Sequence, residues 1–338
     1  MATREGNSLT AAEIKGYIRQ LVPLGLKAVI LSGGGNPILH KSKSPKLSDD
    51  GFDFNDVVDW LHDVMGLEIG VITNGMPLVE YGFSVKSPDR MARRSWKTVR
   101  PETLDKLTWV RISMSGLDHK ENEVYVPDID PSKTTLGFSY VAHDIYEVPE
   151  EPNHGKVSTE EDLVNNGGEA RSVFRFEDRI PTLTKQIDEM VRSHRPRYVR
   201  LLPNCLEVEK DQRPLRATPR NSRCNRSKCR LRPVQPPAAP PNCWLGVLHP
   251  VLNSDGFVYP CDSCVLNKSA GHKFAEPWRV CRWDKIGELY AASARSLIKD
   301  PATLCPGCVF TRSNLLLQAV VDGAPLQSPE PVTHPNFV

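Results

Sequence analysis

Five short runs of apolar residues along the chain have the length of strands. The first run, AVIL, contains no polar residue, which is typical of a strand buried on both faces of a parallel sheet. The predicted strands are Ala28–Leu31, Glu68–Ile72, Trp109–Met114, Gly137–Ala142 and Tyr198–Leu202.

Apolar residues at helical spacing lie before and between these runs. Thr10 and Glu13 form a capping box, which predicts the start of a helix with one apolar face. That face consists of Ile14, Tyr17, Ile18 and Leu21. A second helix is predicted over residues 54–65, and its apolar face consists of Val57, Trp60, Leu61 and Val64.

Two further helices are predicted, near Thr103–Leu107 and over Pro181–Ser193. A chain in which strand and helix alternate five times has the pattern of a parallel sheet or a β/α barrel. The segment from His119 to Asp178 is acidic and irregular apart from the strand at Gly137, and it is predicted to be surface loop.

The predicted strands end in small or polar residues: SGGGNP, TNG, Ser113–Ser115 and LLPN. Ligands of parallel α/β folds bind beyond the carboxyl ends of the strands. Gly33, Gly34 and Gly35 suit a place where bare backbone approaches a polar ligand, although a tight turn explains a glycine run equally well. Neither a phosphate loop nor a GxGxxG fingerprint is present.

The net charge, the N-terminal residues and the positions of the cysteines limit the classes of protein to which this chain can belong. The 338 residues carry a net charge of +2, so charge alone favours neither nucleic acid nor membrane as a partner. The chain begins without the basic and then apolar pattern of a signal peptide, and a cytoplasmic location is expected. All nine cysteines lie after residue 204, which favours a metal site over a disulfide framework.

The cysteines follow a basic and proline-rich stretch. Residues 213–232 hold eight Lys and Arg residues and no acidic residue, which fits a solvated insertion or a nucleic-acid contact. A proline-rich linker follows. Beyond it, the turn Asn253–Gly256 predicts a hairpin between the runs Val247–Leu252 and Phe257–Tyr259. The hairpin would bring Cys243 and Cys261 together, and a helix over Glu288–Lys299 leads to the CxxC of Cys305 and Cys308. Four such thiolates suit zinc or an iron–sulfur cluster.

The chain resembles the radical S-adenosylmethionine (radical SAM) superfamily with a C-terminal twitch or SPASM extension. The resemblance lies in the order of five motifs: SGGGNP, ITNG, VRISMSG, C-x12-G-x4-C and the closing CPGC. The resemblance covers residues 8–315. It implies that Cys243, Cys261, Cys305 and Cys308 bind an auxiliary [4Fe-4S] cluster, with Cys264 and Cys281 outside the quartet. It also implies that a group of strand-end residues binds S-adenosyl-L-methionine: Gly33, Gly34, Gly35, Asn36, Thr73, Asn74 and Ser113.

The implied reaction is reductive cleavage of S-adenosylmethionine to a 5′-deoxyadenosyl radical. That radical would abstract hydrogen from a peptide, a protein or a small molecule, with electrons from a donor such as flavodoxin or ferredoxin. The family's CxxxCxxC loop, which binds the cleaving [4Fe-4S] cluster, is absent from the sequence. We therefore expect this chain to be inactive without an upstream segment that supplies that loop and the first barrel strand.

The expected architecture is α/β, with a partial (β/α)6 barrel and a cluster-binding module. The predicted divisions are the barrel over 1–204, the basic and proline-rich insertion over 205–241, the module over 242–315 and a tail over 316–338. The alternative is a non-catalytic, zinc-binding α/β protein that uses Arg213–Arg232 to bind nucleic acid.

Overall fold

The computed structural model describes residues 9–32, 37–40, 52–73, 99–114, 126–142, 145–147, 156–157, 172–174, 176–203, 241–262, 278–293 and 310–324. Within these ranges, no helix combines the length and the apolar character that crossing a membrane requires.

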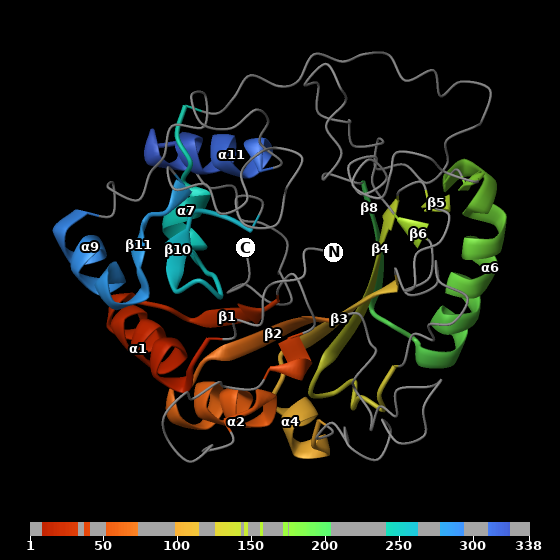
Figure 1. Ribbon diagram of the computed structural model, residues 1–338, viewed down its shortest axis with the longest axis horizontal. Helices are drawn as coiled ribbons and strands as arrows, with labels where there is room; N and C mark the ends of the chain where they lie inside the picture. The colour runs from red at the N-terminus through yellow and green to blue at the C-terminus, as the bar shows by residue number, and fades with distance from the viewer. Residues whose placement is uncertain are drawn as a thin grey trace.

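The fold is built on one parallel sheet of five strands, in the order β1-β2-β3-β4-β8. The strands are β1 (Ala28–Leu31), β2 (Glu68–Thr73), β3 (Trp109–Ser113), β4 (Thr135–Ala142) and β8 (Tyr198–Pro203). All five predicted strands are confirmed to within two residues at either end. Figure 1 shows the sheet as an arc. The described strands form an open sheet and do not close a barrel, so β1 and β8 are its two edges.

Helices cover the outer side of the arc (Figure 1). They are α1 (Ala11–Leu21) with the 3₁₀ turn η1 (Val22–Leu24), α2 (Phe54–Asp59), α4 (Pro101–Asp105) and α6 (Phe176–His194). A short 3₁₀ turn, η2 (Pro37–Leu39), follows β1. The predicted capping box is present at α1, where the Thr10 hydroxyl accepts from the Glu13 amide and the Glu13 carboxylate accepts from the Thr10 amide.

The second predicted helix is interrupted by a π-turn, η3 (Trp60–Val64), which continues α2. The Met65 amide donates to the carbonyl of Trp60, five residues back, at 3.2 Å. This wider turn shifts the side chains that follow it relative to an α-helical face. Val64 was predicted on the buried face, but its exposed fraction is 67%. Gly66 ends the helix as expected, with φ at 66°.

Two other predicted boundaries are wrong. Helix α6 begins at Phe176 and contains Pro181, because a proline removes only one hydrogen bond and need not start the helix. The predicted surface loop contains a small antiparallel sheet of β5 (Ile145–Glu147), β6 (Lys156–Val157) and β7 (Ser172–Phe174). Strands of two or three residues are too short to show a period in the sequence.

The C-terminal module, residues 241–324, holds a three-stranded antiparallel sheet in the order β11-β10-β9. Its elements are α7 (Leu245–Leu248), β9 (Val251–Leu252), β10 (Phe257–Tyr259), β11 (Cys281–Arg282), η6 (Trp283–Lys285), α9 (Ile286–Ser293) and α11 (Thr311–Val321). The predicted hairpin is confirmed, with Gly256 at a φ of 79° in its turn. Its first run is shorter than predicted, because residues 247 and 248 belong to α7. The predicted helix over 288–299 starts at Ile286, and its part beyond Ser293 lies outside the described residues. Helix α11 crosses residue 315, where the sequence placed the end of the module.

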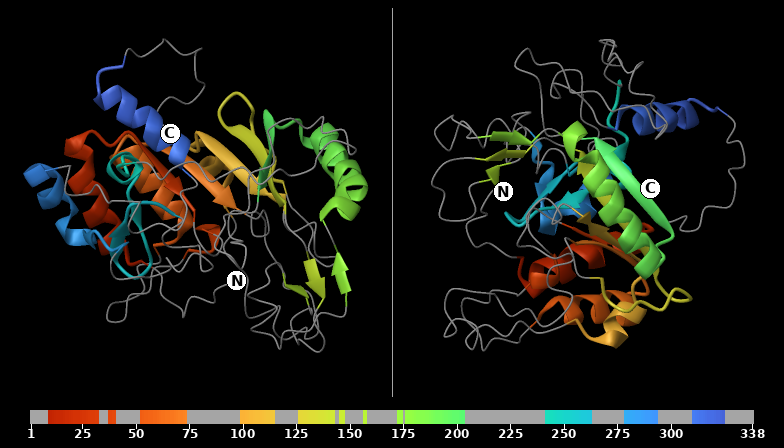
Figure 2. Two further views of the ribbon diagram at one scale, coloured as in Figure 1. Left: turned by 90° about the horizontal axis from the view of Figure 1, so that it is seen from above. Right: turned by 90° about the vertical axis from the view of Figure 1, so that its right-hand side faces the viewer.

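The module packs against α1, beside the β1 edge of the sheet and opposite α6 (Figures 1 and 2). The Gln20 amide group donates to the Trp283 carbonyl at 3.0 Å and accepts from the Gly287 amide at 3.0 Å. The Tyr17 hydroxyl donates to the Pro250 carbonyl at 3.2 Å. Val258 and Ile286 belong to the same buried core as the large sheet. The described part of the chain therefore has one main core that both parts share.

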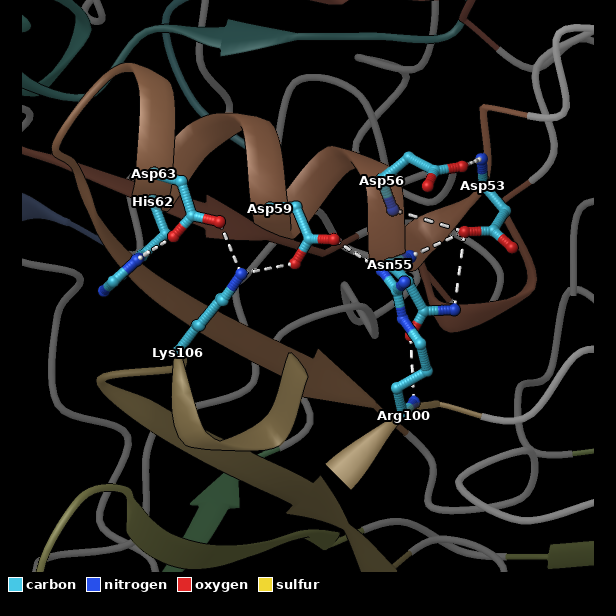
Figure 3. Close-up of polar contacts among 8 residues, drawn as sticks. All are labelled: Asp53, Asn55, Asp56, Asp59, His62, Asp63, Arg100 and Lys106. Atoms are coloured by element: carbon cyan, nitrogen blue, oxygen red, sulfur yellow. Dashed lines mark hydrogen bonds and ion pairs between the residues drawn. The ribbon is translucent and has the colours of Figure 1, made fainter. Parts of the chain in front are cut away.

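Charged side chains join α4 to the second helix on the outer surface (Figure 3). Asp59 accepts from Arg100 at 2.5 Å and from Lys106 at 2.8 Å, and Lys106 also pairs with Asp63 at 2.5 Å. A carboxylate shared by two cations contributes more than an isolated surface pair.

Asp59→Asn is expected to lower the free energy of unfolding by about 1 kcal/mol, because it removes the charge that both cations share. Urea unfolding in low salt measures the change, and added salt should diminish it. Asp284→Asn, at a residue whose ion pair within the described ranges is with Arg282, is the matched control and should have a smaller effect. An equal effect of the two substitutions would contradict this role for Asp59.

Candidate functional site

The two faces of the large sheet differ in chemistry. Ile69, Val71, Val110, Ile112 and Phe138 are almost fully buried and belong to the main core, which the helices complete. Side chains alternate between faces along each strand, and the strand register places their neighbours on the other face. That other face, the inner face, is the concave side of the arc in Figure 1.

Aromatic and polar residues of three neighbouring strands share the inner face. The register aligns Arg111 with Gly137 and Gly137 with Tyr198 in one row, and Ser113 with Ser139 and Ser139 with Arg200 in the next. The inner-face residues of these strands include Trp109, Arg111, Ser113, Ser139, Tyr198 and Arg200. An apolar core on one face and polar groups on the other make the inner face the candidate site.

Two glycines allow the aromatic rings to lie flat across the neighbouring strand. A Cβ atom at Gly70 would lie 2.2 Å from the Trp109 ring, and one at Gly137 would lie 2.1 Å from the Tyr198 ring. The Arg111 guanidinium carbon lies 6.0 Å from the centroid of the Trp109 ring, and that of Arg200 lies 5.1 Å from the Tyr198 ring. Each arginine is therefore held beside an aromatic ring of its own strand.

Arg111 is only partly solvated. Its Nε atom is buried and has no hydrogen-bond partner. Burial lowers the pKa of Arg111, with Arg200 lowering it further and Tyr198 and Asp262 raising it. The protein thus holds two guanidinium groups near each other on the inner face and partly desolvates one of them.

Asp262, the residue after Cys261, is an acidic neighbour of Arg111. Its charge raises the pKa of Arg111, and it also raises the pKa of His249, which burial lowers more strongly. One acidic group of the C-terminal module therefore lies within electrostatic range of an inner-face arginine.

Two of the predicted S-adenosylmethionine residues, Thr73 and Ser113, end neighbouring parallel strands at the same edge of the sheet. Ser113 ends β3 on the inner face. Thr73 ends β2 but is 2% exposed and aligns with Ile112, so alternation places it on the helix-covered face. Five further predicted residues lie outside the described residues: Gly33, Gly34, Gly35 and Asn36, which follow β1 in the sequence, and Asn74, which follows β2.

Two of the four predicted cluster ligands are described. Cys243 and Cys261 are both buried, at 7% and 8% exposure. Cys305 and Cys308 lie outside the described residues, but the chain that follows them comes back to the buried cluster that contains Cys261. Phe310 packs against the buried cluster of Leu245, Tyr259, Cys261 and Trp278.

Helix α11 holds the chain after Cys308 against the segment that contains Cys243. The Asn314 side chain is fully buried and accepts from the Leu245 amide at 2.9 Å. Gln318 accepts from the Trp244 ring nitrogen at 2.7 Å and from Asn242 at 2.8 Å. Asn242 and Trp244, the two residues that donate to Gln318, flank Cys243 in the sequence. The far end of the segment that contains Cys305 and Cys308 is therefore anchored beside Cys243 and Cys261.

Within the described ranges, no three His, Cys, Asp or Glu side chains are grouped as a metal site. The third described cysteine, Cys281, lies in β11. Burial and, to a lesser extent, Asp284 raise the pKa of its thiol to about 11. Cys281 packs against the main core, whereas Cys261 belongs to the separate buried cluster of the module.

The sequence interpretation missed the arginines of the inner face. Both strands carry the same triplet, an aromatic residue, Val and Arg, as Trp109-Val110-Arg111 and Tyr198-Val199-Arg200. An arginine within a predicted strand of a parallel sheet was the available signal, because a charged side chain there needs a partner or access to solvent. The basic segment 213–232 of the alternative interpretation lies outside the described residues.

No family model matches the chain, and neither does any curated protein or solved structure. The function therefore has to be argued from the residues and their arrangement.

Proposed function

We propose that this protein is of the radical SAM type, with S-adenosylmethionine at the carboxyl edge of the large sheet and an auxiliary [4Fe-4S] cluster in the C-terminal module. The observation that carries the proposal is that two predicted cluster ligands, Cys243 and Cys261, are buried in a module that packs against α1 beside the large sheet. S-adenosylmethionine, the cluster and the substrate would then lie on neighbouring parts of the fold.

The auxiliary cluster would be held by four residues: Cys243, Cys261, Cys305 and Cys308. Thiolates are the ligands that iron–sulfur clusters take, and two of the four are buried next to the anchor of the CxxC segment. The sequence lacks the CxxxCxxC loop that would hold the cleaving cluster. With that cluster and S-adenosylmethionine both bound, the two groups would supply the radical that abstracts hydrogen from the substrate. The chain's own residues would orient the substrate and exclude water.

The iron content of the full chain tests the cluster. After anaerobic reconstitution with iron and sulfide, we expect about four irons and four acid-labile sulfides per chain from the auxiliary cluster. The same protein should not bind zinc stoichiometrically in competition with iron and sulfide. Binding of about one zinc without sulfide would instead identify a structural zinc site and overturn the cluster.

A glycine substitution tests the cofactor edge. Gly34→Val is expected to weaken S-adenosylmethionine binding by about tenfold or more, because a branched side chain would occupy the place of a backbone contact. Equilibrium dialysis with labelled S-adenosylmethionine measures this, and an unchanged iron content shows that the module is intact. Unchanged affinity would make the glycine run a simple turn.

A further inference from the structure

We propose that Arg111 and Arg200 bind a carboxylate or phosphate group of the substrate on the inner face of the sheet. The inference rests on the proposed function only in calling the bound molecule a substrate. The anion site itself follows from the two arginines and their surroundings.

Arg111 and Arg200 lie two strands apart and two residues apart along the sheet. Standard strand spacing puts their Cα atoms ~12 Å apart. Two arginine side chains can converge across that distance on one anion. The residue between them in the row of Arg200 is Ser139, a small polar residue of the same face.

Within the described ranges, neither Arg111 nor Arg200 forms an ion pair, and the Nε atom of Arg111 is buried without a hydrogen bond. Asp262 is the acidic neighbour from the module, which leaves two cations against one carboxylate. A buried N–H group without an acceptor is costly, and an oxyanion bound at the Nε atom of Arg111 would reduce that cost.

A guanidinium presents its N–H groups as a planar fork that matches two oxygens of a carboxylate or phosphate. The rings of Trp109 and Tyr198, seated over Gly70 and Gly137, limit the movement of the two forks. Ser113, at the predicted cofactor edge, lies in the same row as Arg200. An anion held here would anchor a substrate beside the cofactor.

Calorimetric titration of the full chain tests the site, with inorganic phosphate and succinate as probes and succinamide as the uncharged control. Arg111→Gln and Arg200→Gln should each weaken binding of phosphate and succinate by about tenfold or more. Arg192→Gln, at an exposed arginine of α6, is the matched control and should bind as the wild type does. Equal binding by all variants, or succinamide binding as well as succinate, would overturn the proposal.

Thermal unfolding separates a binding role from a structural one. Without an anion, Arg111→Gln should keep or raise the Tm, because it removes a partly buried charge whose Nε donor has no hydrogen-bond acceptor. Phosphate should raise the Tm of the wild type more than that of the variant. A lower Tm in Arg111→Gln, together with unchanged phosphate affinity in Arg200→Gln, would make the arginines structural and refute the site.

Binding of S-adenosylmethionine identifies the source of the anion. We expect Arg111→Gln to bind the cofactor as the wild type does, with phosphate and cofactor bound at the same time. If the cofactor displaces phosphate and the variant loses both, the arginines bind the cofactor's own carboxylate, and the substrate assignment is wrong. If anion binding depends on both arginines while the iron test fails, the anion site stands and the radical SAM proposal fails.

Discussion

Replacing Cys261 by alanine is expected to remove the auxiliary cluster, whereas the same change at Cys281 is expected to leave it intact. Cys261 is buried beside Phe310, which follows the CxxC segment by two residues. Cys281 packs instead against the main core of the protein. Iron per chain should fall from about four to less than one in Cys261→Ala and stay at about four in Cys281→Ala.

Loss of the cluster should also loosen the module, because metal binding and folding are coupled in small thiolate domains. Protease digestion of Cys261→Ala should cleave the C-terminal segment faster than digestion of Cys281→Ala. Full iron content in Cys261→Ala would show that another residue, such as Cys264, completes the ligand set. Equal loss of iron in both variants would contradict the assignment of Cys281 as a bystander.

Gly16→Ala is expected to destabilise the protein, although alanine in the middle of a helix normally stabilises it by about 1 kcal/mol. The added Cβ atom would lie 2.2 Å from the Trp283 ring, which packs on α1. A rigid ring in a packed interface cannot move without displacing its neighbours. We expect a net loss of about 1–3 kcal/mol in the free energy of unfolding.

A double-mutant cycle checks the cause of that loss. In a Trp283→Ala background the same Gly16→Ala change should become stabilising by about 1 kcal/mol, because the clash is gone and helix propensity remains. Urea unfolding of the four proteins measures the coupling. A loss of stability that persists without the Trp283 ring would show that α1 and the module do not meet as described.

The sequence predicted the elements whose signals are local. The run AVIL gave β1 its exact bounds, and Thr10 with Glu13 gave α1 its start. The turn of Asn253–Gly256 gave the hairpin. In each case the residues that decide the structure are neighbours in the chain, or lie within one turn of it. Their spacing therefore contains the information.

Local sequence patterns did not predict the structure correctly where contacts with residues distant in the chain decide it. The π-turn after Asp59 changes which residues face the core, and it left Val64 exposed. Strand β11 has two residues and exists because it pairs with β10. Neither feature has a pattern of its own in the sequence.

The sequence by itself determined the α/β class, the five parallel strands and the concentration of cysteines in the C-terminal part. The tertiary structure alone decided that this part packs on α1, through hydrogen bonds between residues 233 and 263 positions apart. It also decided that Arg111 and Arg200 face the same side of the sheet. Register between strands depends on how whole elements pair, and no residue in either strand specifies it locally.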